Sequence, residues 1–193
     1  AELTDKSFEQ DLSELVHQNE VIALGECGLD YFRNFSSKET QKIVFEKQLI
    51  LSVELQLPLF LHQRDAHDDF LSMINEHCTH PVKGVAHCFT GTKEELIDCV
   101  EMGFYIGITG WICDERRGTH LKDVINLIPL NKIMIETDAP YLIPRIPKLK
   151  TLHRNEPKYL PYVAKEVIKN SKESEESLIS SMFLNSLSFF NLN

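Results

Sequence analysis

The 193-residue chain lacks several features that would identify its class at once. No apolar run approaches the length needed to span a bilayer, and the N-terminal stretch AELTDKSFEQ has no basic region followed by an apolar one. We therefore expect neither a membrane protein nor a targeting segment. The five cysteines are an odd number without a CxxC pair, which argues against a disulfide framework or a zinc knuckle. Free thiols indicate an intracellular, cytoplasmic protein, with a nuclear or organellar location left open.

Positive charge is also scarce, because 20 Lys and Arg residues face 29 Asp and Glu residues and the formal net charge is −9. This balance speaks against a protein that coats nucleic acid through a basic face. It leaves open an enzyme that acts on nucleic acid, since divalent cations and a few placed arginines can create a local positive site. There is no low-complexity linker and no repeat, so the length predicts a single domain over residues 1–193.

Apolar segments alternate with helical patterns along the chain. Two sequences resemble capping boxes: Ser36 to Glu39, before a helix that carries Ile43, Ile50, Val53 and Leu57, and Thr92 to Glu95. The strands, which are nearly continuously apolar, are predicted at 21–26, 57–64, 82–89, 104–110 and 132–138. Such alternation indicates an α/β fold with a parallel sheet or barrel.

Four of the five predicted strands have a metal-ligand residue type at or just after the carboxyl end: Glu26, His62, His87 and Asp138. In parallel α/β folds, active sites are built at that edge of the sheet. Each residue alone has a simpler explanation, as a hydrogen-bonded core histidine, a helix cap or a turn former. Together, two imidazoles and two carboxylates at one edge predict a site for one or two divalent ions.

Six ordered motifs give the chain a family resemblance from about residue 20 to its end. They are GECGLDY (25–31), FLHQRDAH (60–67), HCFTGT (87–92), YIGITGWICDERRG (105–118), ETDAPYL (136–142) and HRNEP (153–157). The combination resembles the TatD family of metal-dependent deoxyribonucleases. The resemblance implies a TIM-barrel-like parallel β/α fold, a divalent-metal site and hydrolysis of phosphodiester bonds in DNA.

The resemblance also implies roles for the four strand-end residues. Glu26 would be a catalytic metal ligand, shared between ions where two bind, and His62 and His87 would be the imidazole ligands. Asp138 would be the last ligand and the general base that orients or deprotonates the attacking water. Mg²⁺ is the first expectation for the metal, and sites with two histidines and carboxylates also accept Mn²⁺ or Zn²⁺.

The chain departs from the family in length, since a closed barrel needs eight strand–helix units and around 250 residues. The five strands correspond to the fourth through eighth strands of the family, so we expect a barrel that is incomplete at its N-terminus. Many members supply an HxH pair from the first strand and others lack it; this sequence contains no HxH. Ala1 is not a start methionine, which suggests a processed, trimmed or partial chain. Five strands alone would expose apolar sheet edges, through which another copy could pair unless the protein has more sequence.

Candidate substrate contacts are arginines. Arg64 lies two positions after His62 on the same strand face, and Arg116, Arg117 and Arg154 lie in segments that the resemblance places near the mouth of the site. The alternative for all four is a solvated surface position. Trp111 and Tyr141 could stack on a splayed base. Glu136, two positions before Asp138, could support the metal ligands from behind.

Three functions agree with these features. The leading one is a metal-dependent nuclease that works from single-stranded DNA ends, with RNA left open as a substrate. The same site could hydrolyse esters or amides, for example an aminoacyl ester on RNA. An incomplete barrel could also be an inactive remnant that binds only metal or a partner.

Overall fold

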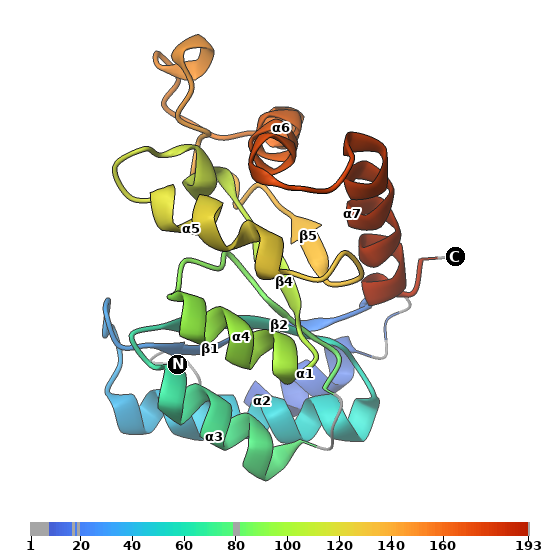
Figure 1. Ribbon diagram of the computed structural model, residues 1–193. Coiled ribbons are helices and arrows are strands. Elements are labelled where there is room, and N and C mark those ends of the chain that lie inside the picture. Colours follow the sequence, from blue (N-terminus) through green and yellow to red (C-terminus); the bar gives the residue numbers. More distant parts are fainter. Residues whose placement is uncertain (1–7, 17, 19, 79–81, 193) are drawn as a thin grey trace. The chain divides into compact units, whose positions relative to one another are not determined.

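The structure is a computed structural model that describes residues 8–16, 18, 20–78 and 82–192 (Figure 1). The expectation that residues 1–7 hold no targeting segment lies outside this described part. The helices are α1 (Phe8–Leu15), α2 (Lys38–Leu55), α3 (His67–His77), α4 (Lys93–Glu101), α5 (Thr119–Val124), α6 (Leu160–Asn170) and α7 (Glu175–Phe190). The strands are β1 (Leu24–Asp30), β2 (Leu59–Arg64), β3 (Gly84–Ala86), β4 (Tyr105–Ile108) and β5 (Ile133–Ile135).

The described residues form two compact units. The first runs to Val85 and includes Phe189–Leu192, and the second comprises Ala86–Ser188. Strand order follows the sequence, β1-β2-β3-β4-β5, and the unit boundary falls within β3. The expectation of one domain over the whole chain stays a prediction.

In the first unit, β1 and β2 pair in parallel, from Leu24 opposite Leu59 to Asp30 opposite Arg64. Helices α2 and α3 pack against these strands and against each other (Figure 1). The rings of Phe45 on α2 and Phe70 on α3 stack with centroids 5.6 Å apart. These buried rings form part of the support beneath the strands that carry Glu26 and His62.

Helix α2 differs from its sequence prediction in its cap and in its buried face. The N-cap is Ser37, whose hydroxyl accepts a hydrogen bond from the backbone N–H of Thr40, so the predicted box from Ser36 to Glu39 is wrong by one residue. The helix buries Phe45 and Leu49, whereas the predicted apolar residues Ile43, Ile50 and Val53 are exposed. The predicted residue Leu57 lies beyond the end of the helix.

In the second unit, β4 and β5 pair in parallel, from Ile106 opposite Ile133 to Ile108 opposite Ile135. The capping box predicted for α4 is confirmed, because Thr92 and Glu95 exchange side-chain and backbone hydrogen bonds. Helix α6 contacts β5 and the short 3₁₀ segment Gly110–Cys113 that follows β4. The buried core of this unit includes Leu96, Phe104, Ile106, Ile108, Ile112, Val163 and Val167.

The predicted α/β class with a parallel sheet is confirmed, and the described residues contain the five strands that were expected. Most strands are shorter than predicted: β3 and β5 have three residues each. Within the described part of the chain, no helix has both the length and the apolar character that a bilayer crossing requires.

Candidate metal centre

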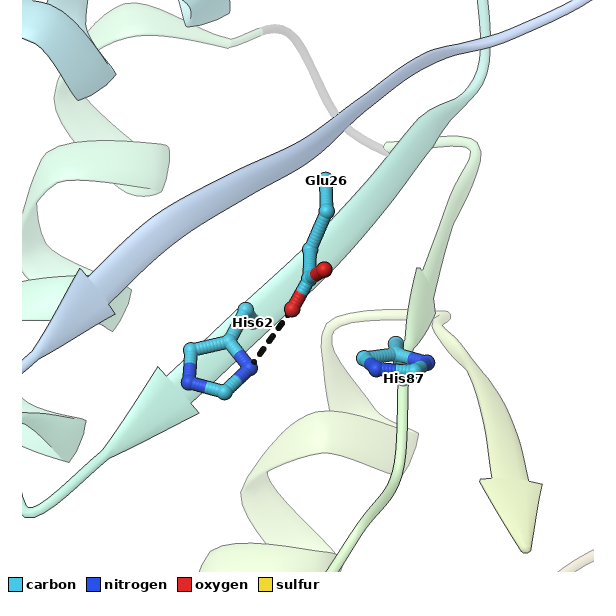
Figure 2. A group of neighbouring side chains, drawn as sticks. All are labelled: Glu26, His62 and His87. Carbon is cyan, nitrogen blue, oxygen red and sulfur yellow. Dashed lines mark ion pairs between the residues drawn. The ribbon is translucent and has the colours of Figure 1, made fainter. Parts of the chain in front are cut away.

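Glu26 lies inside β1, not at its end as predicted. The register with β2 shifts between Gly25 and Cys27, so Glu26 occupies an irregular position without a partner residue in the ladder. Such bulges turn a side chain away from the regular alternation. The carboxylate of Glu26 is half exposed, and its Oε1 lies 3.1 Å from Nδ1 of His62 (Figure 2).

His62 is the fourth residue of β2, and it has a carboxylate near each ring nitrogen. Its Nε2 lies 3.3 Å from Oδ2 of Asp30, the last residue of β1, while its Nδ1 faces Glu26. If Nε2–H donates to Asp30, the lone pair of Nδ1 is directed at Glu26. This is the tautomer in which a histidine binds metal, with the other ring nitrogen held by a carboxylate.

The close approach of β1 to His62 depends on Gly28. Its φ is +142°, and a Cβ at this position would lie 1.8 Å from the carbonyl oxygen of His62. Any side chain would therefore push the two strands apart. Glycine at this position keeps Asp30 and Glu26 within reach of the imidazole.

His87 directly follows β3, as predicted, and has the same two-sided arrangement in the second unit. Its Nδ1 lies 2.9 Å from Oε2 of Glu136, and its Nε2 lies 3.7 Å from Oδ1 of Asp138. Glu136 is itself held by the backbone N–H of Cys88, which donates to its Oε1. The predicted supporting role of Glu136 agrees with this contact, and Nε2 is left as the metal-binding nitrogen of His87.

Asp138 lies three residues beyond the end of β5, because the strand stops at Ile135 and not at residue 138 as predicted. Its φ is +54°, a left-handed conformation that aspartate tolerates better than most residues. The buried side-chain amide of Asn155 fixes the segment around it by donating to the carbonyl oxygens of Thr137, Tyr141 and Leu142, at 2.7, 2.7 and 3.3 Å. The position of Asp138 is therefore set by hydrogen bonds outside the sheet.

The donor chemistry of both units suits a divalent cation. In each, one imidazole nitrogen is engaged by a supporting carboxylate, Asp30 or Glu136, and the other faces a second carboxylate, Glu26 or Asp138. A lone pair that faces a carboxylate is repelled unless a proton or a metal ion lies between them. Two imidazoles and carboxylate oxygens are suitable ligands for Mg²⁺, Mn²⁺ or Zn²⁺.

Two of the four predicted substrate arginines, Arg116 and Arg117, are bound to a buried carboxylate. Arg116 Nη2 and Arg117 Nε lie 3.0 and 3.1 Å from Oδ2 of Asp114, and Nε of Arg145 forms an ion pair with the same oxygen at 3.0 Å. The side-chain hydrogen bond from Arg116, then the bond from its backbone N–H and that from the side chain of Arg117, hold the pKa of Asp114 well below its usual range. Asp114 therefore remains ionised and forms ion pairs with three arginine side chains.

The other predicted substrate residues are exposed or partly buried. The guanidinium of Arg64 stacks 3.8 Å from the ring centroid of Phe32, and Arg154 is exposed. Tyr141 is 71% exposed, so its ring is available for stacking. Trp111 is partly buried, with the guanidinium of Arg117 4.2 Å above its ring. The roles of these residues in substrate binding stay predictions.

Sequence reasoning missed three residues that shape these contacts: Asp30, Asn155 and Arg145. Asp30 and Asn155 act through partners 32 and 13 to 18 positions away, which no local pattern reveals. The sequence shows that Asp114 in DERRG has two arginines nearby, which would neutralise its charge if the carboxylate were buried. It contains no local signal for the third arginine, Arg145.

Comparison with known proteins places the chain in a family. Residues 1–191 match the protein family described as "TatD related DNase". A protein of Pantoea sp. named 3'-5' ssDNA/RNA exonuclease TatD is 47% identical over 182 residues, which cover 94% of this chain and 70% of that protein. Its namesake in Escherichia coli K12 is 49% identical over 161 residues, covering 82% of this chain and 62% of the relative. The chain thus spans about two thirds of the length of these relatives.

Solved structures agree with this assignment. A TatD homologue from Escherichia coli K12 superposes with a TM-score of 0.89 at 26% identity, covering 100% of this chain and 73% of that structure. A TatD family hydrolase from Entamoeba histolytica gives a TM-score of 0.85 at 30% identity, covering 98% and 70%. The predicted TIM-barrel-like parallel β/α class is confirmed by these likenesses. The chain belongs to the TatD related DNase family.

Proposed function

We propose that the protein is a divalent-metal-dependent nuclease that removes nucleotides from single-stranded 3′ ends of DNA, and of RNA as well. The observation that carries the proposal is the repeated arrangement of one imidazole between a supporting and a facing carboxylate, at His62 and at His87. Membership of a DNase family and the naming of the relatives as 3'-5' ssDNA/RNA exonucleases support the substrate class.

In this proposal Glu26, His62, His87 and Asp138 hold one or two divalent ions. A bound divalent cation would lower the pKa of water and offset the charge of the scissile phosphate. Asp30 and Glu136 keep the two imidazoles in the metal-binding tautomer. Mg²⁺ is the first expectation because the substrate is a phosphodiester and two of the four proposed ligands are carboxylates.

The side chains themselves supply acid–base chemistry and orientation. Asp138 accepts the proton of the attacking water, and the Asn155 contacts hold the backbone segment from which its carboxylate projects. Glu26 contributes a second carboxylate oxygen on the side of His62. Arg64 and the exposed Arg154 offer guanidinium groups to phosphates next to the cleaved bond.

The test is hydrolysis of single-stranded DNA and RNA oligonucleotides, labelled at the 5′ end, by the 193-residue chain. Metal-dependent ladders that shorten from the 3′ end, disappear with chelator and are lost in Asp138→Asn would support the proposal. Asp123→Asn, an exposed aspartate on α5, is the matched control and should keep full activity.

Two other results would replace the proposal. Folded protein that binds Mn²⁺ but cleaves no oligonucleotide would identify an inactive metal-binding protein. Cleavage of small esters or aminoacyl esters at a rate independent of oligonucleotide length would identify an ester or amide hydrolase. Light scattering on the same sample would test the predicted self-association.

A further inference from the structure

The second unit contains a cavity of about 430 Å³, lined by residues of the segment 110–117, which follows β4, and of the segment 140–153, which connects β5 to α6. Its aromatic and potentially cationic lining residues are Trp111, Arg117, Tyr141, Arg145, Lys150 and His153. None of the proposed metal ligands lines it. Its volume lies in the range of small-ligand sites.

The charge at this cavity is unbalanced. Among the lining residues, Asp114 brings one negative charge and Arg117 and Arg145 bring two positive charges, so these three have a formal excess of one positive charge. Arg116, which lies outside the lining, also pairs with Asp114. Lys150 adds a further ammonium group to the lining. In a chain with a net charge of −9, such a local excess indicates an anion site.

The geometry of the arginines leaves donors for that anion. Arg117 and Arg145 each approach Asp114 through Nε, and within the described part of the chain no hydrogen bond or ion pair engages an Nη group of either arginine. Their side chains are 49% and 57% exposed. The buried carboxylate thus orients both guanidinium groups while their outer N–H groups remain available for phosphate oxygens.

An aromatic surface lies beside these donors. Tyr141 is 71% exposed and lines the cavity together with Trp111, whose ring already carries Arg117 on one face. Exposed aromatic rings next to phosphate-binding groups are the arrangement by which proteins hold single-stranded nucleic acid without reading its sequence. A phosphate alone would not need this apolar surface.

We propose that this cavity is a nucleotide subsite: Arg145 and Arg117 bind one phosphate, and the base of the same nucleotide stacks on Tyr141. The subsite would hold a nucleotide of the substrate strand through residues other than the proposed metal ligands. The choice of a nucleic-acid strand as the ligand rests on the proposed function. Binding of a nucleotide at the subsite itself requires neither a metal ion nor cleavage of a bond.

The test is binding of deoxyadenosine monophosphate to the full chain carrying Asp138→Asn, in chelator, by calorimetry. Arg145→Gln should weaken binding at least tenfold, with Arg145→Lys intermediate because it keeps the charge but loses the planar fork. Lys148→Gln, which removes an exposed charge outside the cavity lining, is the control and should bind like its parent. Thermal melts would verify that each variant folds.

Partial ligands separate the two halves of the subsite. Tyr141→Ala should weaken binding of deoxyadenosine monophosphate and deoxyadenosine and leave inorganic phosphate unchanged, whereas Arg145→Gln should weaken the monophosphate and inorganic phosphate. Binding that is insensitive to Arg145→Gln, or absent from the folded parent, would overturn the subsite even if the oligonucleotide assay shows cleavage. Conversely, sensitive binding without any cleavage would uphold the subsite and reject the nuclease.

Discussion

At the scale of single residues, the supporting carboxylates set the basicity and orientation of the proposed ligands. Glu136→Gln keeps the size of the side chain beside His87 but removes the charge that fixes the ring tautomer. We expect Mn²⁺ affinity to fall about 10- to 100-fold, as is typical when a histidine ligand loses its carboxylate partner. Calorimetric titration of the metal-free protein measures this directly.

The matched control for this variant is Glu101→Gln, an exposed glutamate at the end of α4. It changes the net charge equally and should leave the affinity as it was. Equal affinities in the two variants would mean that Glu136 serves only to hold the backbone N–H of Cys88.

The sequence predicted the chemistry of the site better than its immediate surroundings. His87 and Asp138 could be found because a ligand-type residue after a short apolar strand is unusual, and the structure brings these two together. Glu26 and His62 were also predicted, yet both lie within strands, because β1 continues to Asp30 and β2 to Arg64. The register shift at Glu26, which changes the direction of a side chain, was not predicted. Asp30 could not be found, since its role depends on the register between β1 and β2.

At the scale of elements, the start of α2 gives a test that separates the structure from the sequence pattern. Ser37→Ala removes the hydroxyl that accepts the N–H of Thr40 and should lower the free energy of unfolding by about 1 kcal/mol. Ser36→Ala is the internal control, because the structure gives that hydroxyl no capping role. Urea denaturation of both variants measures the difference, and a larger loss for Ser36→Ala would return the cap to the position that the sequence predicted.

The buried face of α2 shows why periodicity alone predicted the wrong buried residues for this helix. Apolar residues occur around most of its circumference, so Ile43, Ile50 and Val53 fit a helical stripe as well as Phe45 and Leu49 do. The choice between the two faces is made by tertiary packing, through the stacking of Phe45 on Phe70 of α3. For α4, whose capping box is unambiguous, the sequence sufficed.

At the scale of the whole molecule, the cysteines link stability to alkaline pH. All five are free thiols, and burial raises the pKa of Cys99 and of Cys113 to about 12. The unfolded chain ionises these thiols from about pH 9, whereas the folded chain keeps them protonated. The folded state then binds more protons, so the free energy of unfolding falls as pH rises from about 9 toward 12.

Urea denaturation in reductant between pH 8 and pH 10.5 would measure this slope. Each buried thiol should contribute up to about 1.4 kcal/mol per pH unit above its unfolded pKa. Cys99→Ala should reduce the slope while it also lowers stability at all pH values through the lost packing. A slope that is the same in Cys99→Ala would show that other groups cause the alkaline loss. The cytoplasmic location that the free thiols suggested stays a prediction.

The arrangement of the chain as a whole was accessible from its sequence, because strands joined by helices in sequential order are the simplest outcome of alternating apolar and helical segments. The contacts of the arginines were harder to predict from the sequence. Arg116 and Arg117 were expected near substrate from their place in DERRG, and that role stays a prediction. Their ion pairs with the buried carboxylate of Asp114 were not foreseen, because composition does not reveal which acid is buried.

The contacts of Asn155 have a consequence for chain entropy. Its amide joins the carbonyl of Thr137 to a residue 18 positions later, so one side chain closes a loop that contains both Asp138 and Arg145. Closing a flexible loop of this length costs conformational entropy that grows only slowly with the number of residues. A single polar residue therefore restrains the proposed base and the proposed nucleotide subsite together, as a cross-link would. Loosening it would raise the mobility of both at once.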